Sequence, residues 1–395
     1  MSTRSNKADT IFTHAGNKPH ENFGVVNPPV YHASTILHRT VAEMEAAQKN
    51  RFKKGNMSYG RHGTPTTFAV EEAVAEAEGG ERAVAFCSGA AACYGAILGF
   101  VKSGDHLLMV DTVYGPVRAF CHGFLKRFGV ETTFYDPMIG AGIAGLLRDN
   151  TRVIYLESPG SITFEVQDVP AIVAAAKARG IATLFDNTWS APLFFQPLRH
   201  GIDISIIAGT KYIVGHSDAM MGFAVGSGSS FLAVRQAAAE LGYHAAPDDC
   251  YLALRGLRTA GVRMRHQEQQ ALKLATWLRG RPEVERVLHP ALPGHPGHEF
   301  WRRDFTGSSG LFSIELKRDT PAAAISAMLD GMELFGMGAS WGGYESLILP
   351  SHPERMRTAT PWTGGPVLRL HAGLEDIGDL IADLEQGFAR LAAAR

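Results

Sequence analysis

The chain has 395 residues, more than one hydrophobic core usually supports, so we expect a large domain and a smaller one. Its 38 Lys and Arg residues balance 39 Asp and Glu residues, which leaves no charge excess to attract nucleic acid or an anionic membrane. The first ten residues lack the apolar stretch of a signal peptide, and the apolar runs elsewhere fall far short of the roughly 20 residues of a membrane span, so we expect a soluble cytoplasmic protein.

The first half of the chain shows the alternation of strands and helices that is typical of parallel βαβ units. Residues 1–62 are polar and irregular, and we expect them to form an arm that packs on another body. Short apolar runs at 83–86, 106–111, 131–136, 152–157, 182–187 and 204–209 then predict strands. Helical spacing at 66–78, after Ser88 and Gly89, at 115–129 and at 169–180 predicts helices between them. The pattern predicts an α/β fold with a mostly parallel sheet covered by helices on both faces.

The alternation of short strands and helices ends near Tyr251. A long or broken helix begins there and is followed by a Pro/Gly/His-rich loop at 289–298, a strand candidate at 310–316, a helix at 322–332 and a final helix at 374–394. These elements predict a smaller α/β domain of about 140 residues. The expected division is an arm at 1–62, a large domain at 63–255 and a small C-terminal domain at 256–395.

Asp186 and Lys211 each follow an apolar run that predicts a buried strand end. Most such pairs in soluble proteins are surface charges, but a buried carboxylate or ammonium is costly unless something neutralises it. Pyridoxal phosphate neutralises both, since the amine forms a Schiff base with its aldehyde and the carboxylate keeps its ring nitrogen protonated. The pair therefore indicates a pyridoxal phosphate enzyme.

Two further segments suit such a cofactor. In AFCSGAAACYGAI a strand runs into Ser88 and Gly89, where free amides and the dipole of the next helix would hold a phosphate. Small residues at a helix start also serve packing alone. Tyr114 follows a strand, at the sheet edge where ligands bind. Its ring could stack on the cofactor and its hydroxyl could transfer protons. A purely structural tyrosine fits that position equally well.

A dinucleotide motif and a metal site are both rejected, whereas the partner of the buried charge on Arg369 is left undecided. GAGIAG at 140–145 fits a dinucleotide fingerprint, but no full helix follows it. His295 and His298 lack further ligands and the cysteines lack CxxC spacing, so no metal is expected. Arg369 lies in an apolar strand-like run and needs a carboxylate partner, either internal or the α-carboxylate of an amino-acid substrate.

Motifs along nearly the whole chain together resemble the pyridoxal-phosphate enzymes of cysteine and methionine metabolism, and within them the bacterial cystathionine β-lyases. They include SYGRHGTPT, CSGAAA, VDTVYGP, ESPGSITFEVQD, FDNTW, GTKYIVGHSDAMMG, SWGGYESL and LRLHAGLED. The resemblance implies the aspartate aminotransferase fold, called fold type I. It also implies a homotetramer made of two dimers, with active sites shared across each dimer.

The same resemblance implies a role for each matched residue. Lys211 would carry the cofactor and act as the catalytic base, assisted by Tyr114, which stacks on the ring, and by Asp186, which binds the ring nitrogen. The phosphate site would comprise Ser88, the amides of Gly89 and Ala90, the hydroxyl of Thr210, and Tyr59 and Arg61 of the neighbouring subunit. The substrate site would comprise Ser340, Trp341 and Arg369, with Tyr59 of the neighbour.

The resemblance favours β-elimination of L-cystathionine to homocysteine, pyruvate and ammonia. Relatives that act at the γ-carbon show an Asn where this chain has Ser161, and usually a Leu where it has Trp341. Ala208 and Ala339 depart from the family pattern and leave phosphate and substrate contacts in question. The alternatives are a γ-lyase or γ-synthase, a methionine γ-lyase, a broad cysteine-conjugate β-lyase, and a non-catalytic cofactor-binding regulator.

Overall fold

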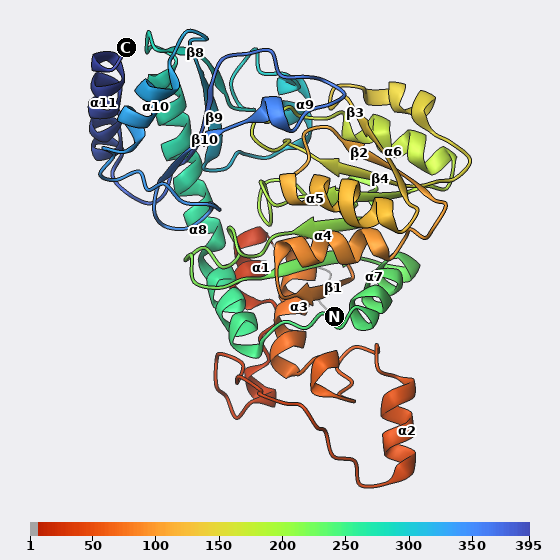
Figure 1. Ribbon diagram of the computed structural model, residues 1–395. Coiled ribbons are helices and arrows are strands. Elements are labelled where there is room, and N and C mark those ends of the chain that lie inside the picture. The colour runs from red at the N-terminus through yellow and green to blue at the C-terminus, as the bar shows by residue number, and fades with distance from the viewer. Residues whose placement is uncertain (1–6) are drawn as a thin grey trace.

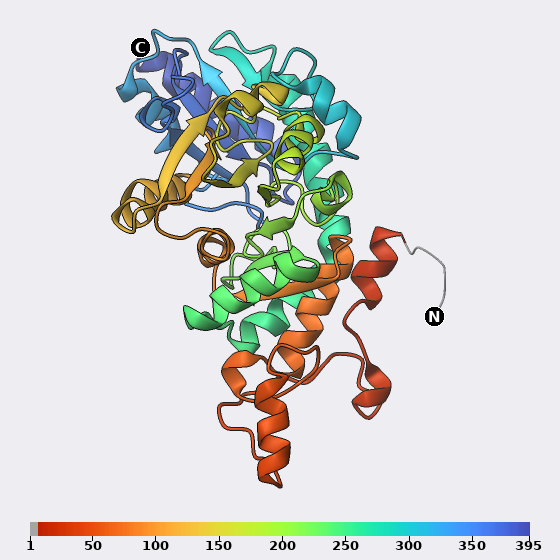
Figure 2. The ribbon, with the colours of Figure 1, turned by 90° about the vertical axis from the view of Figure 1, so that its right-hand side faces the viewer.

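The computed structural model describes residues 7–395, so the first six residues of the expected arm lie outside it. Residues 7–62 form two short helices, α1 (Ala8–His14) and α2 (Val41–Lys49), and two 3₁₀ turns, η1 (Pro19–Glu21) and η2 (Gly60–His62). The expectation of a wholly irregular arm is therefore wrong. Helix α2 buries only Ala47, so no apolar stripe marks it in the sequence. It projects from the body in both views (Figure 1, Figure 2).

A seven-stranded sheet forms the centre of the large body, in the order β1-β7-β6-β5-β4-β2-β3. Its strands are β1 (Arg82–Phe86), β2 (His106–Val110), β3 (Glu131–Tyr135), β4 (Thr151–Glu157), β5 (Ala182–Asp186), β6 (Ile204–Ile207) and β7 (Gly222–Gly226). All neighbouring strands run parallel except β7, which is antiparallel to β1 and β6. The six expected strands are present. Strand β7 was missed because it begins and ends with glycine and has only three apolar residues between them.

Helices follow the expected positions between these strands. They are α3 (Pro65–Ala77), α4 (Gly89–Leu98), α5 (Gly115–Phe120) with the π-helical continuation η3 (Cys121–Leu125), and α6 (Val169–Ala178). Helix α7 (Gly228–Glu240), which follows β7, and the 3₁₀ segments η4 (Gly140–Leu146) and η5 (Pro197–His200) were not predicted. GAGIAG forms η4 rather than the start of an α-helix, in agreement with its rejection as a dinucleotide motif.

Strand β1 shows how the sheet is covered on both faces. Ala83 and Ala85 point into one apolar core together with Val74 of α3, whereas Val84 and Phe86 point into another. This alternation is the two-residue period of a strand that is buried on both sides. The strand ends, rather than the sheet faces, are therefore where polar groups gather.

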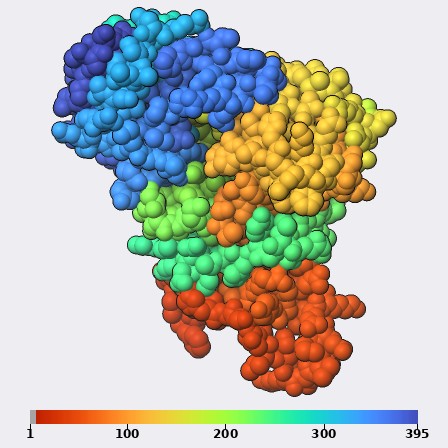
Figure 3. All heavy atoms as spheres, in the orientation of Figure 1, coloured from red at the N-terminus to blue at the C-terminus, as the bar shows by residue number. Residues whose placement is uncertain are grey.

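A second sheet of four antiparallel strands lies at the other end of the molecule, in the order β10-β11-β9-β8. Its elements are β8 (Val284–Leu288), α9 (His298–Asp304), β9 (Leu311–Leu316), α10 (Ala322–Leu329), β10 (Leu347–Ser351), η6 (Pro353–Arg355), β11 (Val367–His371) and α11 (Ile377–Ala393). The N-terminal segment and this C-terminal part occupy opposite ends (Figure 3). The single 32-residue helix α8 (Pro247–Leu278) runs between the two bodies and contains the expected boundary at 255/256 (Figure 1).

Candidate active site

The carboxyl ends of β4, β5 and β6 bring the central groups together. Glu157 and Asp186 are the last residues of β4 and β5 and are partners in register, and Lys211 lies in the turn that follows β6. Parallel strands end at one edge of a sheet, which is where open α/β sheets bind ligands. The sequence prediction that Asp186 and Lys211 share a site edge is consistent with this arrangement.

Asp186 is a buried carboxylate with one oxygen free of strong partners. Its Oδ1 accepts the amide of Thr188 at 3.0 Å and the Thr188 hydroxyl at 2.5 Å. Its Oδ2 meets only the thiol of Cys93, at 3.8 Å. Burial raises the pKa of Asp186, while the bonds from Thr188 lower it. Oδ2 is thus available to a buried donor such as a protonated ring nitrogen.

The Lys211 amine is held by residues of the C-terminal part. Its Nζ donates to Ser340 Oγ at 2.5 Å and lies 5.5 Å from the ring centroid of Trp341. Burial, with the charge of Arg369, lowers the pKa of Lys211 to about 8, although Asp186 opposes this shift. With such a pKa, about one tenth of the amine is neutral at pH 7, far more than for an ordinary lysine, and the neutral amine is the form that attacks an aldehyde.

Helix α4 begins beside the turn that carries Lys211. Ser88 caps it by accepting the amide of Ala91 at 3.1 Å, which leaves the first amides, those of Gly89 and Ala90, without an intrahelical acceptor. A Cβ on Gly89 would lie 2.4 Å from Cβ of Ala208, so only glycine allows this close approach. These amides and the Ser88 hydroxyl form a cradle that fits a phosphate.

The hydroxyl of Thr210 points to the main chain. It donates to the carbonyl of Met221 at 3.1 Å and accepts the amide of Met221 at 2.9 Å. Its one proton is thus used within the connection between β6 and β7. The phosphate contact expected of Thr210 therefore requires this hydroxyl to exchange partners.

Tyr114 stands at the start of α5, where 44% of its surface is exposed. Its amide donates to Glu157 Oε2 at 2.7 Å. Burial and neighbouring acidic groups raise the pKa of its phenol, and Arg369 opposes them. Sequence reasoning did not single out Glu157, although its place at the end of an apolar strand run, as for Asp186, is the signal that could have found it.

Arg369 lies in the middle of β11, and its Nη2 donates to the carbonyl of Ser340 at 2.8 Å. Within residues 7–395 it forms no ion pair with a carboxylate, so the internal partner that the sequence left open is absent there. Ser340 adopts φ +79°, a strained conformation for a residue with a side chain. Arg369 thus remains free to bind a carboxylate bidentately.

Tyr59 and Arg61 do not join this cluster within one chain. The Tyr59 hydroxyl accepts from Ser34 Oγ at 3.4 Å, and Arg61 Nη1 donates to the carbonyl of Ala239 at 2.8 Å. Both side chains are exposed on the arm. The structure therefore brings together the other predicted residues around Lys211 and leaves these two apart from it.

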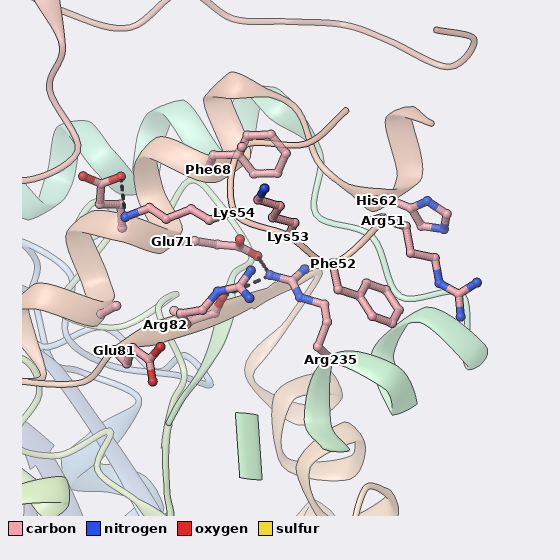
Figure 4. A pocket seen from close by; sticks show the side chains of 14 residues that line it. Arg51, Phe52, Lys53, Lys54, His62, Phe68, Glu71, Glu81, Arg82 and Arg235 are labelled. Atoms are coloured by element: carbon pink, nitrogen blue, oxygen red, sulfur yellow. Dashed lines mark hydrogen bonds and ion pairs between the residues drawn. The ribbon is translucent and has the colours of Figure 1, made fainter. Parts of the chain in front are cut away.

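A hollow beside the arm is a charge cluster distinct from this site. Figure 4 shows cationic side chains facing carboxylates there, with Arg235 Nη2 2.7 Å from Glu71 and Lys54 Nζ 3.1 Å from Glu72. His295 and His298 each bond a main-chain carbonyl instead of meeting each other. Nowhere in residues 7–395 do three or more His, Cys, Asp or Glu side chains gather in a way that would hold a metal ion.

The residues at this edge fit pyridoxal phosphate. A free carboxylate oxygen on Asp186 suits the ring nitrogen, the amine of Lys211 suits the aldehyde, and the cradle at Gly89 suits the phosphate. The fold and site thus define an enzyme of the pyridoxal-phosphate class with fold type I.

Comparisons with known proteins narrow the class. The family model "Cys/Met metabolism PLP-dependent enzyme" matches residues 9–389, and the chain belongs to this family. It is 48% identical over 391 residues to the cystathionine β-lyase MetC of Escherichia coli K12, with 98% of this chain and 99% of that protein covered. It is also 42% identical over 395 residues to the L-alanine/L-glutamate racemase of Wolbachia pipientis wMel, with 98% of each covered. A crystal structure of metB from Corynebacterium glutamicum superposes with a TM-score of 0.90 at 31% identity, over 99% of this chain and 100% of that one.

Proposed function

We propose that the protein is a pyridoxal-phosphate-dependent lyase that cleaves L-cystathionine by β-elimination into homocysteine, pyruvate and ammonia. The observation that carries the proposal is the buried amine of Lys211, with a pKa of about 8, close to a buried carboxylate and to a guanidinium that lacks a carboxylate partner. The relatives named cystathionine β-lyase, at 44–48% identity, support this choice of substrate.

The binding roles follow from the chemistry of each group. Arg369 and Ser340 would bind the substrate α-carboxylate, and Asp186 would accept at Oδ2 a hydrogen bond from the protonated ring nitrogen. The amides of Gly89 and Ala90 hold the phosphate together with Ser88. Thr210 would add a donor if its hydroxyl rotates, so that its hydrogen bond goes to the phosphate instead of the Met221 carbonyl. Trp341 forms the wall beside the amine.

When bound, pyridoxal phosphate supplies an electron sink for the negative charge that forms at Cα. The Lys211 amine, once released, takes the Cα proton at Nζ and then delivers a proton to the departing sulfur. A pKa near 8 suits both transfers, because the group readily gains and loses a proton near neutral pH. Tyr114 assists at the same face through its hydroxyl.

The test is incubation of the purified protein with L-cystathionine, followed by identification of the keto acid. The proposal expects pyruvate and homocysteine. Predominant 2-oxobutyrate and cysteine would replace it with γ-elimination, and no turnover by the cofactor-loaded protein would favour a regulator. Because a 42% identical relative is a racemase, formation of D-alanine from L-alanine is measured in parallel, since racemisation needs the same Cα proton transfer without a leaving group.

We further propose a cytoplasmic homotetramer of two dimers, in which the arm (1–62) reaches the partner while residues 63–255 bind the cofactor and residues 256–395 form the small domain. Large apolar side chains on the arm support the contact, since Phe23 is 105% exposed, Leu37 90% and Val26 68%. None of the helices in residues 7–395 has the length and apolar character that a bilayer crossing requires. Tyr59 and Arg61 would complete the partner's phosphate site, with Tyr59 also meeting the substrate.

Complementation tests the shared site. Homo-oligomers of Lys211→Ala and of Arg61→Ala should each have little or no activity. Co-refolding the two should restore activity, because some mixed dimers contain one site with both residues intact. If mixed dimers form and no activity returns, Arg61 acts within its own subunit and the shared-site proposal fails.

A further inference from the structure

Glu157 connects two segments that border the ligand edge. It is buried at the end of β4, where its Oε2 accepts the amide of Tyr114 at 2.7 Å and its Oε1 accepts the hydroxyl of Ser161 at 2.5 Å. The two donors come from the turn after β2 and from the turn after β4. The carboxylate of Glu157 therefore sets the spacing between Tyr114, which is expected to stack on the cofactor ring, and Ser161.

The Ser161 hydroxyl is used entirely within the protein. Its single proton goes to Glu157, while the Ser161 amide donates to the carbonyl of Thr112 at 2.8 Å. A Cβ on Gly160 would lie 2.2 Å from Thr112 Oγ1, so this turn lies directly against the segment that leads to Tyr114. Ser161 thus orients Glu157, and its hydroxyl has no second proton to donate to a ligand.

No cationic side chain among the described residues pairs with Glu157. Within residues 7–395 it forms no salt bridge, and its register partner is the carboxylate of Asp186. Burial raises the pKa of Glu157, and the neighbouring Asp186 raises it further, whereas the bonds from Ser161 and Tyr114 lower it. Two buried carboxylates side by side favour a cation between or beside them.

We propose that Glu157 is a positioning residue that fixes Tyr114 and Ser161 at the ligand edge and, together with Asp186, favours the protonated ring nitrogen of the bound cofactor. The proposal rests on the proposed function, because it concerns the same cofactor. It adds a second carboxylate to the site, one that acts through other residues and through its charge.

The test compares Glu157→Gln and Ser161→Ala with wild type. Glu157→Gln keeps the size and one acceptor oxygen but removes the charge, and Ser161→Ala removes one bond and keeps the charge. The matched control is Glu71→Gln, another buried glutamate, which pairs with Arg235 away from the site. Three quantities are measured for each protein: the dissociation constant of pyridoxal phosphate for the apoprotein, the pH midpoint of the visible absorbance of the holoprotein, and the melting temperature.

Glu157→Gln should weaken cofactor binding about tenfold and lower the absorbance midpoint by about one pH unit, because loss of a nearby negative charge disfavours protonated forms. Ser161→Ala should move the midpoint less, and Glu71→Gln should change only the melting temperature. If Glu157→Gln lowers the melting temperature as Glu71→Gln does and leaves affinity and midpoint at wild-type values, Glu157 is purely structural and the proposal is wrong. These readouts concern cofactor binding, so a cofactor-loaded protein that fails to cleave cystathionine would refute the proposed function separately.

Discussion

The pKa of the Lys211 amine is expected to respond in opposite directions to two single substitutions. Burial is the main cause that lowers it to about 8, the charge of Arg369 lowers it further, and the charge of Asp186 raises it. Arg369→Met removes a repelling cation and should raise this pKa. Asp186→Asn removes an attracting anion and should lower it.

The size of the effect follows from the fraction of neutral amine. At pH 7 a pKa of about 8 leaves about one tenth of the amine neutral, whereas the ordinary value of 10.5 would leave about 0.03%. Only the neutral amine attacks an aldehyde, so the site should make cofactor attachment about 300-fold faster at pH 7 than an ordinary lysine of equal access. Each substitution changes the rate of cofactor attachment at pH 7 about tenfold for every pH unit by which it moves the pKa of the Lys211 amine.

The assay is competitive acetylation of the apoprotein with trace acetic anhydride between pH 6 and 10. Mass spectrometry quantifies the peptide that contains Lys211, and exposed Lys273 is the internal reference. Because the cofactor is absent, a variant that binds it poorly still gives a midpoint. The reasoning is refuted if wild type titrates near the ordinary lysine value, or if Arg369→Met and Asp186→Asn share the wild-type midpoint.

Three further outcomes are expected. Borohydride reduction of the loaded enzyme should trap the cofactor on Lys211, and Lys211→Ala should trap none; a label found on another lysine by peptide mapping would overturn the assignment. Cofactor-loaded Asp186→Asn should turn over about 10²–10³ times more slowly, and nearly unchanged turnover would mean that this carboxylate does not face the ring nitrogen. Asp111→Ala should lower the free energy of unfolding by about 3 kcal/mol, because it leaves buried Arg118 without its ion-pair partner. Urea denaturation measures this loss, and a loss below about 1 kcal/mol would contradict a buried ion pair.

The amino-acid sequence alone determined six strands of the central sheet and the two charged residues at or just after the ends of two of them. Apolar runs closed by a polar residue are a local pattern, so the positions of Asp186 at the end of β5 and of Lys211 shortly after β6 were predictable. The start of α4 at Gly89 was predictable for the same reason. Strand β7 and helix α2 were missed, because one has only three residues between its terminal glycines and the other has almost no buried side. Helix α7 and strands β8 and β10 were not predicted either.

Only the tertiary structure decided which groups meet. The contacts of Glu157 with Tyr114, of Lys211 with Ser340, and of Asp111 with Thr358 join positions 43, 129 and 247 residues apart. No local periodicity encodes such pairs, since they depend on how separately folded segments pack against one another. The same holds for Thr210, whose hydroxyl bonds the main chain of Met221 because the antiparallel β7 follows β6. Sequence patterns thus report which groups are buried, whereas their hydrogen-bond partners are chosen by the packing of distant elements.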